Sequence, residues 1–295
     1  MSLLLPEPGA PWWAPYAGVA PRVFAQVAGG AQAHEALGAV LSSSPIASSP
    51  IELAAGPLRF VPGDSAPEGE AYEAFIARTA GVPTRHNLHD LFNGLAWLRF
   101  PCIKRRLNEL QAAQIASEGV GARRGPLRDA LTLLDENGAL LSAPPPIWQA
   151  LLARDWRALF VTHRPLWAQA RLAVFGHALL EKLTAAPRKN LTAHVLVLPD
   201  ELRNTDADFD ALAGAPAFAP EWLARKPFTP LPVMGIPGWS PENENFSFYD
   251  DSEVFRPRRT PEERTTPGPA FPPSLKRAVR PPSERHTSSS TEIPT

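Results

Sequence analysis

Proline limits what this chain can fold into more than any other residue, because 35 of its 295 residues are proline. The average usage is about 5%, less than half of that share. Proline fixes its own φ angle, lacks a backbone donor, and is disfavoured inside helices and central strands. We therefore expect short helices and strands separated by irregular segments.

Hydrophobic residues supply material for a core despite the prolines. They make up 44% of the chain and include eight tryptophans, which excludes a wholly disordered protein. No segment approaches the ~18 consecutive apolar residues of a membrane span, and the N-terminus lacks the basic region of a secretory signal. A single cysteine, Cys102, excludes a disulfide framework. These features predict a cytoplasmic protein without a membrane partner.

The C-terminal 40 residues differ from the rest in composition. Residues 256–295 contain nine prolines, eight basic residues and four glutamates, so they predict a disordered, mildly basic tail. Nucleic acid is only weakly supported as a partner, because the tail mixes charges and the remainder of the chain is net acidic. The expected organisation is a Pro/Ala-rich arm (1–54) that packs on the core, one domain (55–255) and the tail (256–295).

Hydrophobic spacing predicts a single α+β domain that is mostly helical. The strongest helix is expected at 165–184, where one apolar face recurs at Leu172, Phe175, Leu179 and Leu183. A hairpin is expected at 130–141, because Asn137-Gly138 suits a type I′ turn. With a strand at 192–198 it would form a small antiparallel sheet. Long irregular Pro-rich segments, including 226–239, complete the expected fold.

The densest run of polar residues lies at the start of a predicted helix. Asn87 is a good N-cap, with Asp90 three residues later. His89 and Asn93 are then four residues apart on one face, away from the leucines. Such a face offers an imidazole and an amide to a ligand or metal ion, and Asp90 could ligate or orient His89. Helix capping explains Asn87 and Asp90 equally well.

A second pair, His177 and Glu181, is also spaced four residues apart. Burial of this pair would suit acid–base chemistry or metal binding, whereas an ordinary ion pair is the structural alternative. Asp135 and Glu136 fall in the expected hairpin turn, and turn chemistry accounts for them there. The two polar pairs are the candidates for a site.

Five blocks of sequence resemble a family of uncharacterised proteobacterial proteins that is catalogued as a domain of unknown function. The blocks are VPTRHNLHDLFNGLAWLRFPCIKRRLNELQ, RGPLRDALTLLDENGA, FGHALLEKL, KPFTPLPVMGIPGW and FYDDSEVFRP. They cover about residues 55–259 in order. The resemblance implies one cytosolic domain and brings no activity. It increases interest in the polar residues inside the blocks, among them His89, Asp90, Asn93, Arg128 and His177.

These observations lead to two hypotheses about function. The first is a metal-assisted or acid–base hydrolase in which His89, Asp90, Asn93, His177 and Glu181 form the site. A divalent metal ion would be held by His89, Asp90 and His177, and Arg128 would hold an anionic group. The alternative is a non-catalytic binding or interaction protein that uses the Pro-rich 226–239 segment or the basic tail.

Overall fold

The computed structural model describes residues 3–6, 9–43, 51–119, 125–185, 187–198, 209–214 and 218–258. The expected tail beyond residue 258 lies outside this part of the chain. The α-helices are α1 (Ala20–Ala28), α2 (Ala33–Ser43), α3 (Tyr72–Thr79), α4 (Leu88–Arg99), α5 (Pro101–Glu118), α6 (Pro126–Asn137), α7 (Pro145–Ala153), α8 (His177–Ala185) and α9 (Pro220–Leu223). Within the described ranges, none of the helices combines the length and apolar character needed to cross a bilayer.

The strands are short and form three small sheets. They are β1 (Glu52–Leu53), β2 (Gly56–Pro57), β3 (Arg59–Pro62), β4 (Gly81–Thr84), β5 (Gly138–Ser142), β6 (Arg171–Val174), β7 (Thr192–Val197) and β8 (Thr229–Pro232). The largest sheet has the order β6-β5-β7-β8. Short helical turns fill many connections: η1 (Pro11–Tyr16), η3 (Ala158–Thr162), η4 (Arg164–Gln169), η6 (Phe209–Gly214), η8 (Val233–Gly235), η9 (Pro241–Glu244) and η10 (Phe246–Asp250).

The expected α+β class is confirmed, although the main sheet is mixed rather than antiparallel. Strand β5 runs antiparallel to β6 but parallel to β7, and β8 closes the order antiparallel to β7. The strand predicted at 192–198 is therefore correct. Strand β8 comes from the 226–239 segment that was expected to be irregular. Its prolines, Pro230 and Pro232, are tolerated because β8 is an edge strand.

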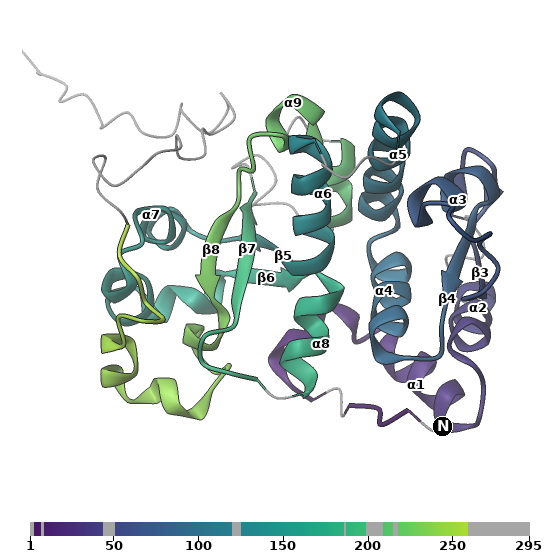
Figure 1. Cartoon of the computed structure of the whole chain (residues 1–295). Coiled ribbons are helices and arrows are strands. Elements are labelled where there is room, and N and C mark those ends of the chain that lie inside the picture. The colour runs from purple at the N-terminus through teal and green to yellow at the C-terminus, as the bar shows by residue number, and fades with distance from the viewer. Residues whose placement is uncertain are drawn as a thin grey trace, which may run out of the picture.

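The elements pack in layers around the four-stranded sheet (Figure 1). Helix α7 lies on one side of the sheet, and α6 and α8 lie on the other. Beyond α6 and α8 stands the pair α4 and α5, followed by α3, α2 and the parallel pair β3–β4. Helix α4 contacts α8, and α5 contacts α6. The boundary between these two helix pairs is where the candidate site lies.

The hairpin predicted at 130–141 is wrong, because the first half of this segment is the end of α6. Pro126 starts that helix, and Leu127, Leu131 and Leu134 bury one face of it. Gly138 then opens β5 with an ordinary φ of −78°, so the Asn137-Gly138 pair makes no type I′ turn. A Cβ at position 138 would lie 2.3 Å from the carbonyl oxygen of Leu134. The glycine is needed here for close packing rather than for a turn.

The long helix predicted at 165–184 is also wrong. The segment forms the 3-10 turn η4, strand β6 and only then helix α8, which begins at His177. Gly176 separates strand from helix. The apolar residues of the predicted face are shared between β6 and α8, and both elements contribute them to the same core. A helical spacing therefore arose from two elements of different type.

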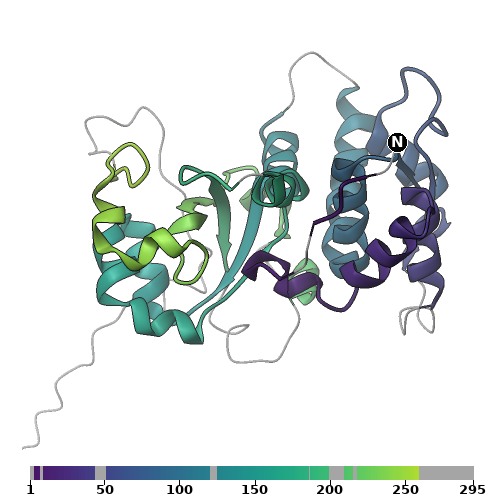
Figure 2. The same ribbon diagram turned by 90° about the horizontal axis from the view of Figure 1, so that it is seen from below.

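The N-terminal segment contributes to the same hydrophobic core as the later elements. Trp13 and Tyr16 of η1 are 2% and 0% exposed. Figure 2 shows η1 passing close beneath the sheet, where it contacts β6 and α4. The Tyr16 hydroxyl donates a hydrogen bond of 2.9 Å to the carbonyl oxygen of Val174, the last residue of β6. The N-terminal segment thus braces the strand that leads to His177.

Replacing Tyr16 by phenylalanine is expected to lower the free energy of unfolding by about 1–3 kcal/mol, because the Val174 carbonyl would be left buried without a donor. Urea unfolding would measure the loss. Thr192→Val is the control, since its hydroxyl bonds the carbonyl of Asn190 at an exposed position, and a change within about 0.5 kcal/mol is expected there. Equal effects of the two substitutions would contradict the bracing role of Tyr16.

Candidate functional site

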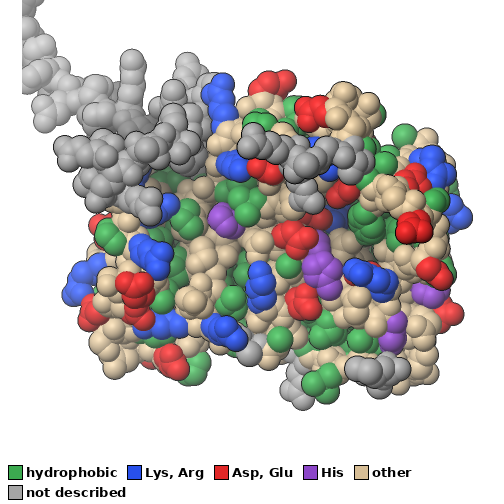
Figure 3. Space-filling model, in the orientation of Figure 1, with side chains coloured by type: hydrophobic (Ala, Val, Ile, Leu, Met, Phe, Trp, Pro, Cys, Tyr) green, Lys and Arg blue, Asp and Glu red, His purple; other side chains and the backbone are tan. Residues whose placement is uncertain are grey.

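A cavity of about 390 Å³ lies against the α4/α5 pair, with α3 and β4 on one side and the ends of α6 and α8 that meet there on the other. Its wall includes His89, Asn93 and His177 of the sequence-predicted site, together with Asp135 and Glu136 from the end of α6. Figure 3 shows histidine side chains exposed among acidic ones near the middle of this face. The volume falls within the range of about 300–1,000 Å³ that is typical of small-molecule sites.

Helix α4 begins where the sequence predicts and thereby places His89. The Asn87 side chain caps the helix by accepting a hydrogen bond of 2.8 Å from the backbone N–H of Asp90. Leucines on the opposite face are buried, so His89 is left facing α8. The Asp90 carboxylate turns the other way and accepts bonds from Arg85, at 3.0 Å from Nε and 2.9 Å from Nη2. Asp90 is therefore occupied by an ion pair rather than directed at His89.

His177 is placed by a close approach of two backbones. Its predecessor, Gly176, lies against the end of α6, where the Gly176 N–H donates to the Gly138 carbonyl oxygen at 2.8 Å. A Cβ on residue 176 would lie 2.5 Å from the Glu136 oxygen and from the nitrogens of Asn137 and Gly138. Only glycine permits this approach. It brings the first turn of α8 beside Asp135 and Glu136.

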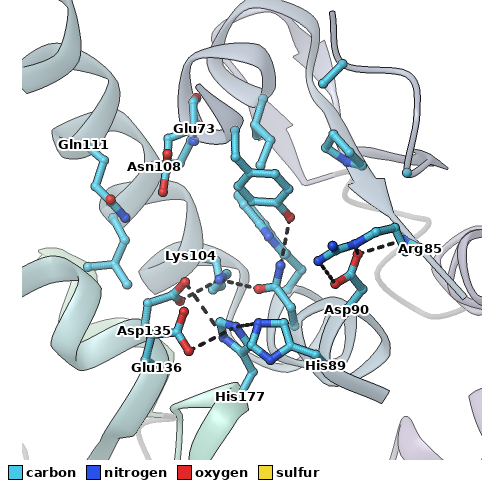
Figure 4. A pocket seen from close by; sticks show the side chains of 18 of the residues that line it. Glu73, Arg85, His89, Asp90, Lys104, Asn108, Gln111, Asp135, Glu136 and His177 are labelled. Carbon is cyan, nitrogen blue, oxygen red and sulfur yellow. Dashed lines mark hydrogen bonds and ion pairs between the residues drawn. The ribbon is translucent and has the colours of Figure 1, made fainter. Parts of the chain in front are cut away.

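The two histidines meet at the floor of the cavity (Figure 4). Nε2 of His89 lies 3.1 Å from Nε2 of His177. The other ring nitrogen of each histidine faces a carboxylate: Nδ1 of His89 is 3.0 Å from Glu181 Oε2, and Nδ1 of His177 is 3.9 Å from Asp135 Oδ2. Glu181 thus reaches across to His89 instead of pairing with His177 on its own helix.

Glu136 completes a group that can hold a metal ion. Its Oε2 lies 3.7 Å from His177 Nε2, and one ligand atom each from His89, His177 and Glu136 falls within 4.8 Å of the others. Metal-bound histidines commonly donate their second ring N–H to a carboxylate, which fixes the tautomer. The arrangement around His89 has this form, whereas Nδ1 of His177 is buried and makes no hydrogen bond to a described residue. Two imidazoles and a carboxylate are ligands typical of zinc and of other divalent transition metals.

A buried ammonium group adjoins the cluster. Lys104 of α5 is 5% exposed, and its Nζ donates to Asp135 Oδ1 at 2.6 Å and to Asn93 Oδ1 at 2.7 Å. The amide nitrogen of Asn93 in turn donates to the Tyr72 hydroxyl at 2.8 Å. The ammonium also lies 5.4 Å from the centroid of the Trp97 ring. Asn93 therefore positions Lys104 and does not contact His89.

The protonation states follow from burial and neighbouring charge. Burial lowers the pKa of His177 to about 4, although Asp135 partly opposes this, so the imidazole is neutral near pH 7. Burial alone would raise the pKa of Asp135, but Lys104 and His177 outweigh it and lower the pKa. Burial and the nearby Asp135 charge raise the pKa of Glu136. The cluster therefore combines a neutral imidazole with an ionised carboxylate.

Of the residues predicted from sequence, the structure brings His89, His177 and Glu181 together, with Asn93 nearby. Asp90 lines the cavity but is paired with Arg85. The carboxylate that lies beside the two histidines is that of Glu136, where the sequence predicts Asp90 as the metal ligand. Arg128 is 7% exposed on α6 and is absent from the described cavity lining, so the structure does not bring it to the histidine cluster.

Sequence reasoning missed Asp135, Glu136 and Lys104. The Asn137-Gly138 pair predicts a hairpin where α6 lies, so the sequence assigns both acids to a turn. The helix dipole offers a signal that could have found all three. Acids are unfavourable at a helix C-terminus and bases at an N-terminus, yet Asp135 and Glu136 end α6 and Lys104 lies in the opening turn of α5. Charges placed against the dipole indicate another interaction that stabilises them.

Comparison with known proteins gives one match. Searches of curated proteins and of solved structures found no match. The model of a family described as "Protein of unknown function (DUF3025)" matches residues 58–259, a span that contains every residue of the cluster. The resemblance seen in the sequence is thereby confirmed, and the chain belongs to the DUF3025 family of proteins of unknown function.

Proposed function

We propose that this protein is a hydrolase that uses a divalent metal ion held by His89, His177 and Glu136. One observation carries the proposal: both histidines direct Nε2 at a common point, and the Glu181 carboxylate fixes the His89 ring through Nδ1 at 3.0 Å. When both rings carry their proton on Nδ1, two nitrogen lone pairs meet at 3.1 Å. A cation between them removes that repulsion.

The distances suit one ion. Metal–ligand bonds of about 2.1 Å allow two ligand atoms to lie up to about 4.2 Å apart. The separations of 3.1 Å between the histidines and 3.7 Å between His177 and Glu136 fall inside this limit. The whole group spans up to 4.8 Å, and a small rotation of Glu136, whose side chain is 35% exposed, would close the difference.

Three protein ligands would leave a position open toward the cavity. A bound divalent ion supplies a water molecule of lowered pKa and polarises a carbonyl or phosphoryl oxygen. The chain's own residues do the rest: Glu181 orients His89, and Lys104 holds Asp135 beside His177. Asp135, ionised and held by Lys104, keeps a negative charge beside the cluster. This arrangement replaces the role that the sequence suggested for Arg128.

The alternative of a non-catalytic interaction protein has less support. The 226–239 segment that would serve as its contact surface contributes Leu231, Val233 and Ile236 to the core. The division into an arm (1–54), a domain (55–255) and a tail (256–295) and the cytoplasmic location stay predictions, and so does nucleic acid as a weakly supported partner.

Metal binding by the full chain is the first test. After chelator treatment, calorimetric titration with Zn²⁺, Mn²⁺, Co²⁺ and Fe²⁺ is expected to give one tight site. His177→Ala and His89→Ala are each expected to abolish it, and Glu181→Gln to weaken it about 10–100-fold, as for other carboxylates that orient a ligating histidine. His163→Ala, outside the cavity lining, is the control.

Hydrolysis of an ester, amide and phosphoester panel by the metal-loaded chain is the second test. We expect turnover that requires the metal and is lost in His177→Ala. The proposal would be wrong if no stoichiometric metal bound, or if His177→Ala bound metal as tightly as the unaltered chain. Metal binding without any hydrolysis would contradict the hydrolase assignment alone.

A further inference from the structure

The cavity extends away from the histidine cluster along α5. Lys104, Asn108 and Gln111 are spaced four and three residues apart, so they share one face of that helix, and all three line the cavity. Figure 4 shows Asn108 and Gln111 on the side away from the histidines, near Glu73 of α3. At 1.5 Å of rise per residue, Gln111 lies about 10 Å along the axis from Lys104.

The far end of the cavity holds polar groups without partners. Gln111 is 5% exposed, and its side-chain amide makes no hydrogen bond within the part of the chain that the structure describes. Asn108 is 6% exposed. Its amide nitrogen donates to the Glu73 carbonyl at 2.9 Å, which leaves its side-chain oxygen as an acceptor. Both amides open into the cavity, where the Gln111 amide and the Asn108 oxygen are available to a ligand.

The charges of the wall define the kind of ligand. Five carboxylates line the cavity, namely those of Glu70, Glu73, Asp90, Asp135 and Glu136, against the two cations Arg85 and Lys104. Both cations are already paired, Arg85 with Asp90 and Lys104 with Asp135. Glu70 is paired with Arg78.

Two carboxylates of the cavity wall, those of Glu73 and Glu136, have no lysine or arginine partner among the described residues. Glu136 adjoins the histidines, and Glu73, at the far end, has no cationic partner among the described residues. The far end therefore offers a carboxylate and amide oxygens as acceptors, with no cation to neutralise them.

We propose that the far end, formed by Glu73, Asn108 and Gln111, binds a primary ammonium or guanidinium group of the substrate. An anionic group would be repelled there, and a neutral group would leave the Glu73 charge uncompensated. The substrate is then a small compound with its hydrolysable bond at the histidine cluster and a cationic nitrogen at the far end of the cavity. The reacting end rests on the proposed function, whereas the cation subsite stands on its own lining.

The test compares an amine with its neutral counterpart and needs no metal. Hexylamine and hexanol are titrated into the metal-free full chain by calorimetry. Hexylamine is expected to bind at least about tenfold more tightly than hexanol, because one charge-assisted hydrogen bond contributes about that much affinity. Glu73→Gln should abolish the preference and Gln111→Leu should reduce it. Glu109→Gln, on the exposed face of the same helix, is the matched control and should retain it.

A second arm uses the zinc-loaded chain with 8-aminooctanoate, octanoate and octanedioate. The amino acid is expected to bind most tightly, and the dicarboxylate most weakly. Equal binding of hexylamine and hexanol, or an undiminished preference in Glu73→Gln, would overturn the cation subsite. Glu73→Gln should leave metal affinity unchanged, so the two proposals can be separated. A chain that prefers the amine but binds no metal would refute the hydrolase and keep the cation subsite.

Discussion

Replacing Lys104 by methionine is expected to lower the free energy of unfolding by about 3 kcal/mol, the cost of breaking a buried ion pair on one side. Lys104 and Asp135 have 5% and 20% of their side chains exposed, so the Asp135 carboxylate would lose its counterion with little water to replace it. Urea unfolding at pH 7 measures the change. The double variant Lys104→Met/Asp135→Asn is expected to recover at least half of the loss.

A surface ion pair of the same residue types serves as the control. Lys226 and Asp129 lie 3.4 Å apart with 47% and 45% of their side chains exposed, and Lys226→Met should cost no more than about 1 kcal/mol. If Lys104→Met cost no more than Lys226→Met, the buried pair would not have the role assigned to it.

The same pair makes stability depend on acid. The folded-state pKa of Asp135 is lowered from an unfolded value of about 3.9. Its contribution is therefore present above that pH and lost as the pH falls through the folded-state pKa. Lys104→Met should lose less stability than the unaltered chain over this acidic range.

Replacing Gly176 by alanine is expected to cost about 3 kcal/mol of unfolding free energy, at the upper end for overpacking. The added Cβ would meet backbone atoms of Glu136, Asn137 and Gly138 at 2.5 Å, and backbone cannot rotate aside. The strand-to-helix junction must therefore move away from α6. Because His177 follows directly, its distance to Glu136 grows and metal affinity should fall at least about tenfold.

Gly38→Ala is the matched control, since a Cβ there meets nothing within 4 Å in the middle of α2. It should stabilise the protein by up to about 1 kcal/mol and leave metal affinity unchanged. A Gly176→Ala variant with unaltered stability and metal affinity would show that the close approach does not position His177.

Local signals in the sequence predicted some elements well and failed at others. Asn87 and Pro101 mark the starts of α4 and α5, because a cap and an N1 proline act within one turn. The Asn137-Gly138 pair and the apolar spacing of 172–183 misled, because their structure depends on contacts with distant segments. Gly138 is held against Leu134, and Gly176 against residues 136–138. No local pattern encodes such an approach.

The candidate site shows the same division. The pairs His89/Asn93 and His177/Glu181 could be selected as helix faces; the structure brings His89, Asn93 and His177 to one cavity, and Glu181 contacts His89 from outside its lining. The partners inside the cluster could not be predicted, because they cross between helices. Glu181 binds His89 rather than His177, and Asn93 binds Lys104.

The split of the cluster between two helix pairs has a consequence for the order of folding. The α4/α5 pair carries only one of the three proposed metal ligands, His89, and the α6/α8 junction carries the other two. Neither pair alone would chelate an ion firmly, so an ion would be captured only after the two pairs have docked. Release would then require that they part, which would make the lifetime of a bound metal a measure of how often this boundary opens.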